Sequence, residues 1–206
     1  MDLTKRRSSM HREMLPLFGS PVVITDLDLP DLVPFVLDLH KTVESTSQSN
    51  AGGWQSPMYT NCSSVEVEPL WEAITQEANR CHQEIGLLHE LKIKHLWFNV
   101  NEKYHFNWPH THVGSIHSGS VYLQVPENSG DLRFQNSNQP AVGWAWSDVL
   151  PENTSNVNVY VNQNDLCIPP RKNMFVMFPS WLDHSVFPNM TDEKRISVAF
   201  DMGLRC

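Results

Sequence analysis

From residue 95 to the C-terminus the sequence reads as a series of short β-strands, and this pattern constrains the fold more than any other feature. The segments are rich in β-branched and aromatic residues and are separated by Gly, Pro and Asn turn signals. They span residues 95–101, 118–125, 131–135, 157–161, 174–179 and 195–202. Short strands at this spacing are typical of a sandwich, a jelly roll or a barrel.

The part of the chain before residue 95 contains one further strand signal and the 3.6-residue period of amphipathic helices. A β-branched segment at residues 15–27, bounded by Gly and Pro, predicts an edge strand. A first helix is expected within residues 28–46, with Asp28 or Asp31 as its N-cap.

A second helix is expected from about Glu68 to Leu91, because apolar residues recur along one face of this segment. Two of its histidines, His82 and His89, lie outside the apolar stripe and are predicted to face solvent. Two helices before a strand-rich region predict an α+β, mainly β, fold in which the helices pack on one sheet.

The length of the chain favours a single globular domain, and its charge and cysteine pattern limit the partners and the compartment that are expected. The chain has 206 residues, enough for one core, with residues 1–14 as a polar tail and residues 15–206 as the domain. Its net charge of −8 argues against general affinity for nucleic acids or an anionic membrane. Scattered cysteines and the lack of a signal-peptide pattern favour a cytoplasmic protein.

Residues 136–160 form a long polar insertion, of the kind that often serves as a lid.

Three histidines have a spacing that suits a metal ion. His110 and His112 alternate in the segment NWPHTHVGS, so an extended backbone would point both side chains to one face. Such imidazole pairs bind iron, zinc or copper. An HxH pair alone more often lies at the protein surface without a metal. A metal site therefore requires a third ligand from elsewhere in the chain. His184, just after the apolar segment 174–179, is the best candidate.

Arg195 and Ser197 alternate on the strand that follows the His184 loop. A buried strand seldom carries an inward-facing arginine unless an anion pairs with it. The guanidinium can hold a carboxylate through two parallel hydrogen bonds, and the serine hydroxyl can add a third. The alternative is an outward-facing Arg195 on an edge strand.

The order of these motifs resembles the 2-oxoglutarate- and iron(II)-dependent oxygenases, and more narrowly an oxygenase family common in marine bacteria and their phages. The matching pieces, from about residue 20 to the C-terminus, are SNAGGWQS, WFNVN, HTHVGSIHSGSVYL, PENSGDLRF, FPSWLDHSV and RISVAF. The resemblance implies a double-stranded β-helix (jelly roll) with Fe(II) held at its open end by His110, His112 and His184. The superfamily usually has HxD; the imidazole of His112 in its place leaves the site more positive.

The resemblance also implies a site for the co-substrate. Arg195 and Ser197 would bind the distal carboxylate of 2-oxoglutarate. Asn99 and Asn101 on the preceding strand, and Tyr122 on the strand after the HxH, are candidate polar contacts. Each of these three could equally be an interior polar residue that hydrogen-bonds to the protein.

Three further positions are interpreted in the light of the resemblance. His105 and His117 lie near the HxH pair in sequence and are expected to support the ligands or to lie at the surface. Before the strand at 174–179 the family favours a glycine turn, whereas this chain has IPPRKN. Asn173 can adopt the left-handed conformation that glycine would supply.

The function implied is a non-haem iron(II) dioxygenase that uses 2-oxoglutarate and O₂ to hydroxylate a small-molecule or peptidyl substrate. The alternative is a cupin-like metal-binding jelly roll without 2-oxoglutarate turnover. Cupins normally place a glutamate shortly after the HxH pair, and VGSIHSG contains none. A third possibility is a non-catalytic jelly roll with a vestigial site; the presence of Arg195 and Ser197 beside the histidines argues against it.

Overall fold

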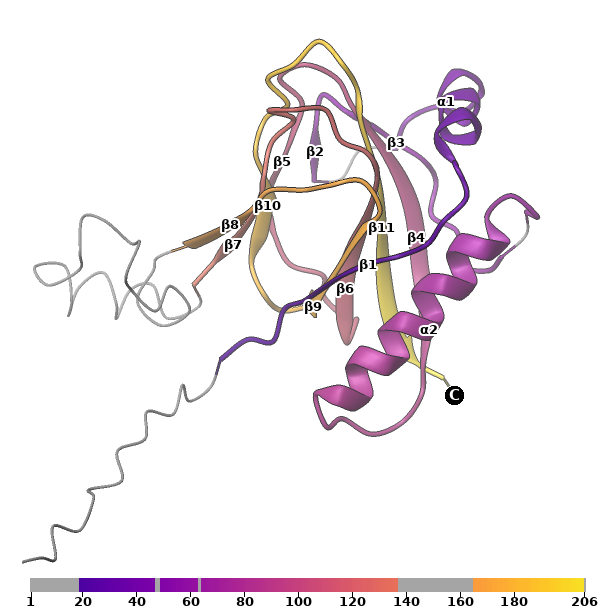
Figure 1. Ribbon diagram of the computed structural model, residues 1–206, viewed down its shortest axis with the longest axis vertical. Helices are drawn as coiled ribbons and strands as arrows, with labels where there is room; N and C mark the ends of the chain where they lie inside the picture. Colours follow the sequence, from indigo (N-terminus) through magenta and orange to yellow (C-terminus); the bar gives the residue numbers. More distant parts are fainter. Residues whose placement is uncertain (1–18, 47–48, 63, 137–164, 206) are drawn as a thin grey trace, which may run out of the picture.

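The computed structural model describes residues 19–46, 49–62, 64–136 and 165–205, which form two helices and two antiparallel sheets (Figure 1). The six-stranded major sheet has the order β1 (Val23–Asp26), β9 (Met174–Pro179), β6 (His117–Gln124), β11 (Arg195–Leu204), β4 (Leu91–Asn101) and β3 (Trp54–Gln55). The five-stranded minor sheet has the order β2 (Asn50–Ala51), β5 (Phe106–His110), β10 (His184–Val186), β7 (Leu132–Gln135) and β8 (Asp165–Ile168).

Most of the predicted strands are confirmed. The segments at 95–101, 118–125, 131–135, 174–179 and 195–202 correspond to β4, β6, β7, β9 and β11. The predicted edge strand is β1, which lies at one margin of the described major sheet and pairs with β9. Asn173 has the left-handed φ of 64° expected for the turn before β9. The tail 1–14, the strand at 157–161 and residues 137–160 of the insertion lie outside the described residues.

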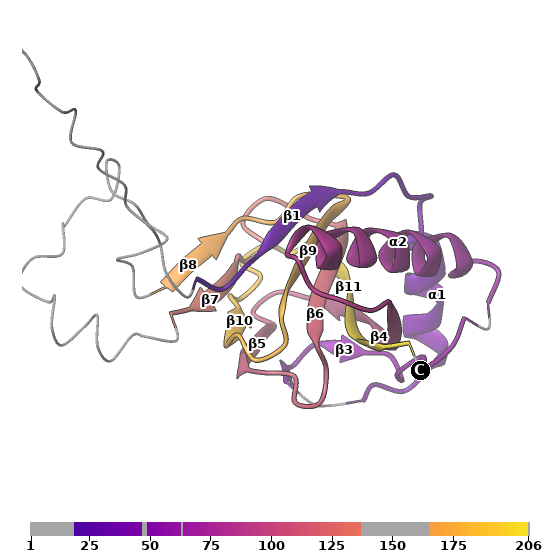
Figure 2. The ribbon, with the colours of Figure 1, turned by 90° about the horizontal axis from the view of Figure 1, so that it is seen from below.

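The helices α1 (Val33–Thr42) and α2 (Glu68–Glu84) lie on the same side of the molecule, away from the minor sheet (Figures 1 and 2). Alternate side chains of β11, including Ile196, Val198 and Phe200, join those of the helices in one apolar core. A fully buried aliphatic or aromatic side chain contributes about 1.5–3 kcal/mol. The predicted α+β layout, with helices packed on one sheet of a jelly roll, is therefore confirmed. Among the described residues, no helix has the length and hydropathy required for a membrane span.

The helix ends have local causes. The prediction that Asp28 or Asp31 is the N-cap of α1 is wrong, because the N-cap is Leu32 and no side chain caps the helix. Asp31 lies one residue earlier, where its Oδ1 accepts from the Val33 N–H at 3.2 Å. The prediction that the second helix continues to Leu91 is wrong, because α2 ends at Glu84. Gly86 has a φ of 84° and terminates the helix in the left-handed conformation that glycine adopts most easily. Leu88, predicted on the apolar stripe, is 77% exposed.

The prediction that His82 faces solvent is also wrong, whereas His89 is exposed as expected. His82 is 2% exposed and joins α2 to β6, with its Nδ1 atom 3.0 Å from His117 Nε2. His82 Nε2 lies 2.9 Å from the Leu88 carbonyl, which can only accept, so Nε2 carries the proton. His82 Nδ1 then accepts from His117 Nε2. His117 Nδ1 is left without a partner among the described residues.

Acid should weaken this contact between α2 and β6. Burial, and secondarily the nearby His82, lowers the pKa of His117 from 6.5 to about 4. The unfolded chain therefore takes up the proton first, so stability is lost as the pH falls from 6.5 towards 4. In His117→Gln the amide can still donate to His82 but does not titrate. We predict a shallower loss of Tm than in the wild type over this range.

The matched control is His89→Gln, which removes an exposed histidine from the same region and should keep the wild-type dependence of Tm on pH. Parallel curves for the wild type and His117→Gln would show that His117 is not the titrating group.

Candidate metal centre and co-substrate cavity

The face of the major sheet opposite the helices carries the polar side chains of the candidate site. Along β11, Arg195, Ser197 and Asp201 alternate with the residues of the apolar core. Ser197 lies opposite Asn99 of β4 and Tyr122 of β6. The sheet therefore arranges polar residues from three strands in one row, which faces the minor sheet.

The three predicted metal ligands converge. The ligand nitrogens of His110, His112 and His184 all lie within 4.8 Å of one another. His110 ends β5 and His184 begins β10, and these two residues are register partners in the minor sheet. His112 follows β5 by two residues, and its ring stacks on Trp97 with 5.8 Å between centroids. Sheet pairing thus sets the separation of two of the three imidazoles.

Hydrogen bonds orient all three rings in the same way. The Nδ1 atoms of His110 and His184 lie 2.6 Å from the Trp108 carbonyl and 2.9 Å from the Leu182 carbonyl. His112 Nδ1 lies 2.9 Å from Asp201 Oδ1. Carbonyl and carboxylate oxygens only accept, so each Nδ1 carries the proton and each Nε2 presents a lone pair.

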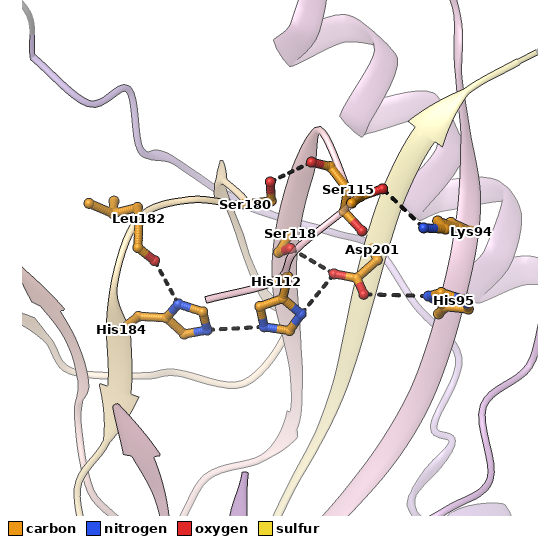
Figure 3. A network of polar contacts seen from close by, with 10 residues as sticks. Lys94, His95, His112, Ser115, Ser118, Ser180, Leu182, His184 and Asp201 are labelled. Carbon is orange, nitrogen blue, oxygen red and sulfur yellow. Dashed lines mark hydrogen bonds and ion pairs between the residues drawn. The ribbon is translucent and has the colours of Figure 1, made fainter. Parts of the chain in front are cut away.

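The unprotonated nitrogens meet at one point. His112 Nε2 and His184 Nε2 are 3.3 Å apart and face each other (Figure 3). Two lone pairs at this distance repel unless a cation lies near both. Burial, and then the proximity of His110, lowers the pKa of His184 to about 3, and burial also lowers that of His110. Neutral imidazoles with free Nε2 atoms are the form that binds a transition-metal ion, so these residues fit a metal.

Asp201 is part of the centre and was not among the residues predicted from the sequence. The residue is 5% exposed, and its carboxylate accepts from Ser118 Oγ at 2.6 Å as well as from His112. His95 Nδ1 lies 3.6 Å from the other oxygen. Burial alone would raise the pKa of Asp201, but the hydrogen bonds from His112 and Ser118 outweigh it and the pKa is lowered. The sequence did contain a signal for this residue, because Asp201 alternates with Arg195 and Ser197 along the same strand.

Arg195 points inward, as predicted, and its strand is interior rather than at an edge. It is 1% exposed, and its Nη1 group donates to the backbone carbonyls of Ser129, Gly130 and Phe187. Burial lowers the pKa of Arg195, yet an arginine remains cationic at neutral pH. Among the described residues no carboxylate lies within ion-pair distance of it, so this buried cation lacks an anion.

A narrow cavity connects the imidazoles with the arginine. Its lining includes the three histidines, Asn99, Tyr122, Arg195 and Ser197. Asn99 Oδ1 is buried and has no partner among the described residues. Burial raises the pKa of Tyr122 to about 12, so its hydroxyl stays protonated and can donate. The cavity therefore offers a cation, hydroxyl groups and a free amide oxygen to a bound ligand.

The remaining candidates lie outside this cavity. Asn101 Nδ2 donates to Asn50 Oδ1 at 2.9 Å, and Asn101 does not line the cavity. His117 pairs with His82, as described above. His105 is partly exposed, and its Nδ1 accepts from the Glu102 N–H at 3.0 Å.

A wider cleft of about 540 Å³ opens beside the histidines. Its walls include Met58, Trp97 and Trp108, and His110 and His112 line both this cleft and the inner cavity. Gln55, which was not predicted as a site residue, also lines the cleft. Gln55 is 2% exposed, and its Nε2 has no partner among the described residues. Pockets of 300–1,000 Å³ are typical of small-molecule sites.

The family model described as "Putative 2OG-Fe(II) oxygenase" matches residues 95–201, which include all three histidines, Arg195 and Ser197. The chain belongs to this family. It is accordingly an oxygenase that depends on Fe(II) and 2-oxoglutarate. A search of curated proteins returns no match.

Solved structures share the fold of this oxygenase. A Pseudomonas putida prolyl-4-hydroxylase is 16% identical over 90% of this chain and 93% of that chain, with a TM-score of 0.59. HygX from Streptomyces hygroscopicus, solved with nickel, 2-oxoglutarate and hygromycin B bound, is 11% identical over 90% and 84%, with a TM-score of 0.56. A Trichoplax adhaerens prolyl hydroxylase in complex with a hypoxia inducible factor peptide fragment is 15% identical over 88% and 82%, with a TM-score of 0.61. At these identities the likeness concerns the double-stranded β-helix fold.

Removal of one imidazole should disable metal binding. In His184→Ala the metal loses one of three ligands, so affinity for Fe²⁺ or Co²⁺ should fall by at least the roughly 100-fold that loss of a ligand's outer partner can cause. Anaerobic titration followed by metal analysis measures the change. The control is His89→Ala, which removes an exposed histidine and should bind metal as the wild type does. Undiminished metal content in a folded His184→Ala protein would disprove the assignment.

Proposed function

We propose that this oxygenase hydroxylates an uncharged or cationic substrate, with Fe(II) held by His110, His112 and His184 and with 2-oxoglutarate held by Arg195. One observation carries the proposal. A single cavity has three converging Nε2 lone pairs at one end and, at the other, a buried arginine that has no anionic partner in the described part of the chain. A dicarboxylate that binds a metal through one end and a guanidinium through the other matches this arrangement.

The residues of the cavity have distinct roles in the proposal. Arg195 and Ser197 bind the distal carboxylate of 2-oxoglutarate and thereby orient its keto acid end towards the histidines. Tyr122 donates a hydrogen bond to the bound co-substrate, and Asn99 contacts it through its Nδ2 group, because the Asn99 Oδ1 atom and the co-substrate oxygens only accept. Asn101 supports this wall indirectly, through its hydrogen bond to Asn50. The bound iron supplies the oxidative chemistry, coupled to decarboxylation of 2-oxoglutarate.

The outer cleft receives the substrate. Trp97, Trp108 and Met58 offer apolar contacts, and the Gln55 amide offers a hydrogen-bond donor to a carbonyl or hydroxyl oxygen. Among the lining residues of the described chain there is no lysine or arginine, and Asp201 is the one acidic side chain. A carboxylated or phosphorylated group would therefore enter the cleft without a permanently cationic partner. The substrate is a molecule whose reacting part is neutral or positively charged.

Turnover of the co-substrate tests the proposed function. The anaerobically reconstituted protein with Fe(II) should bind 2-oxoglutarate, and addition of O₂ should produce succinate. A cupin-like protein would bind the metal but not 2-oxoglutarate, so co-substrate binding separates the two functions. A metal-loaded, folded protein that fails to bind 2-oxoglutarate would exclude the proposal.

Replacing Arg195 should affect the co-substrate and spare the metal. Arg195→Met removes two charge-assisted hydrogen bonds, each worth about 1.5–3 kcal/mol, so 2-oxoglutarate affinity should fall about 100-fold or more. Ser197→Ala, a milder change that leaves the Arg195 contacts in place, should cost several-fold, or about 1 kcal/mol. Calorimetry on the Co²⁺-loaded protein measures both.

Arg171→Met is the control for Arg195, because it removes an exposed ion pair with Asp26 and should leave 2-oxoglutarate binding unchanged. Loss of metal rather than of 2-oxoglutarate in Arg195→Met would mean that Arg195 only maintains the fold.

Substrate charge should decide which compounds stimulate succinate release. Neutral and cationic compounds with an apolar group and an oxygen acceptor should include activators, whereas matched compounds with a carboxylate near the reacting carbon should not. Gln55→Leu, which has a similar volume but no donor, should raise the KM of an activator about tenfold through the lost hydrogen bond. Activation by anionic compounds alone would contradict the proposed substrate class.

A further inference from the structure

We propose that Asp201 is a positioning residue that gives the three-histidine centre, through His112, the negative charge that an HxD motif would place directly on the metal. This inference rests on the proposed function, since it assumes a metal ion at the histidines. Asp201 does not touch the metal in this arrangement. It acts on the metal through the ligand His112, to which it is hydrogen-bonded.

The sheet fixes the position of Asp201. In β11 it lies between two hydrogen-bonded neighbours, with His95 of β4 opposite on one side and Ser118 of β6 on the other. These two neighbours are also its side-chain partners (Figure 3). The carboxylate therefore cannot turn away from His112 without giving up contacts on both sides.

The charge of Asp201 lacks a permanent cation. Among the described residues, no lysine or arginine lies within ion-pair distance of its carboxylate, which is 5% exposed. A buried carboxylate is costly without a positive partner. A divalent ion on His112 Nε2 would provide one, because the Nδ1 proton of the same ring already points at Asp201 Oδ1 at 2.9 Å. Carboxylate–histidine–metal triads of this kind increase the basicity of the ligand and fix its tautomer.

The charge count gives the reason for the arrangement. Three neutral imidazoles leave a divalent ion at +2, whereas two imidazoles and a carboxylate leave it at +1. With Asp201 bonded to His112, the metal and its immediate surroundings again total +1. The carboxylate of Asp201 thus compensates the extra positive charge expected from the HxH motif alone, although it lies behind a ligand and not on the metal.

Co²⁺ titration of Asp201→Asn tests the inference, because Asn keeps a side-chain oxygen that can accept from His112 and Ser118 and removes only the charge. Affinity for Co²⁺ should fall by roughly 10- to 100-fold, the range found for outer partners of metal ligands. The visible bands of the bound Co²⁺ should shift as His112 becomes a weaker donor. Wild-type affinity and unchanged bands in Asp201→Asn would overturn the inference.

Asp183→Asn is the matched control. Asp183 adjoins His184, so its substitution also removes one negative charge near the centre. No described hydrogen bond joins the Asp183 side chain to a histidine. It should bind Co²⁺ within about twofold of the wild type, since a partly exposed charge is largely screened. An equal loss in both variants would mean that general charge, and not the bond to His112, is responsible.

A double-mutant cycle with His112→Asp adds a second criterion. In that background the imidazole that links Asp201 to the metal is gone, so Asp201→Asn should leave Co²⁺ affinity unchanged or increase it. The same loss as in the wild-type background would overturn the inference.

One measurement needs no substitution at Asp201. In the Zn²⁺-loaded wild type the Nδ1 proton between His112 and Asp201 should give a solvent-protected downfield NMR signal that disappears in His112→Gln. Absence of this signal in the metal-bound wild type would also count against the inference. A wild-type protein that binds neither Co²⁺ nor Fe²⁺ would instead overturn the proposed function, and this inference with it.

Discussion

The interior strands β4 and β11 are buried on both faces along most of their length, and the two faces impose opposite requirements. On one face, alternate side chains are apolar and are covered by α1 and α2, which stabilises the sheet through burial of hydrocarbon. On the other face, the intervening side chains are polar or charged, including Arg195, Ser197 and Asp201, and a buried polar group requires a partner. The metal centre and the co-substrate cavity lie where the protein alone supplies only some of those partners.

The parts of the fold and site that were predictable follow from a period of two residues along a strand. Alternation predicted that Arg195 and Ser197 share one face of their strand, because successive side chains in a strand point to opposite sides. It applies less directly to His110 and His112, since β5 ends at His110 and His112 lies in the loop that follows. The structure brings both pairs to one cavity. The meeting of His184 with His110 depends on the pairing of β10 with β5, a contact between distant segments that periodicity cannot specify. There the ordered motifs of the family supplied the missing information.

The errors have local or long-range causes. The second helix was predicted too long because apolar residues continue past Glu84, although Gly86 already marked the turn. His82 was expected to face solvent because it lies off the helical stripe, but a second buried surface, formed with His117 of β6, covers it. Asp201 fits the same alternation as Arg195, yet its partner His112 lies in a loop far away in sequence. Sequence periodicity identifies which face a residue occupies but not which side chain it meets there.

The row of polar side chains facing the minor sheet has a cost for the chain without ligands. Gln55 and Asn99, register partners on β3 and β4, each bury an amide atom that has no partner among the described residues. A buried amide atom that stays without any hydrogen-bond partner opposes folding by about 1–3 kcal/mol. Apolar replacements at these positions would raise the free energy of unfolding. Each replacement would also remove a polar group that can bind a ligand. The polarity of this wall therefore couples the two properties, because a side chain that is available to a ligand contributes less to the free energy of folding.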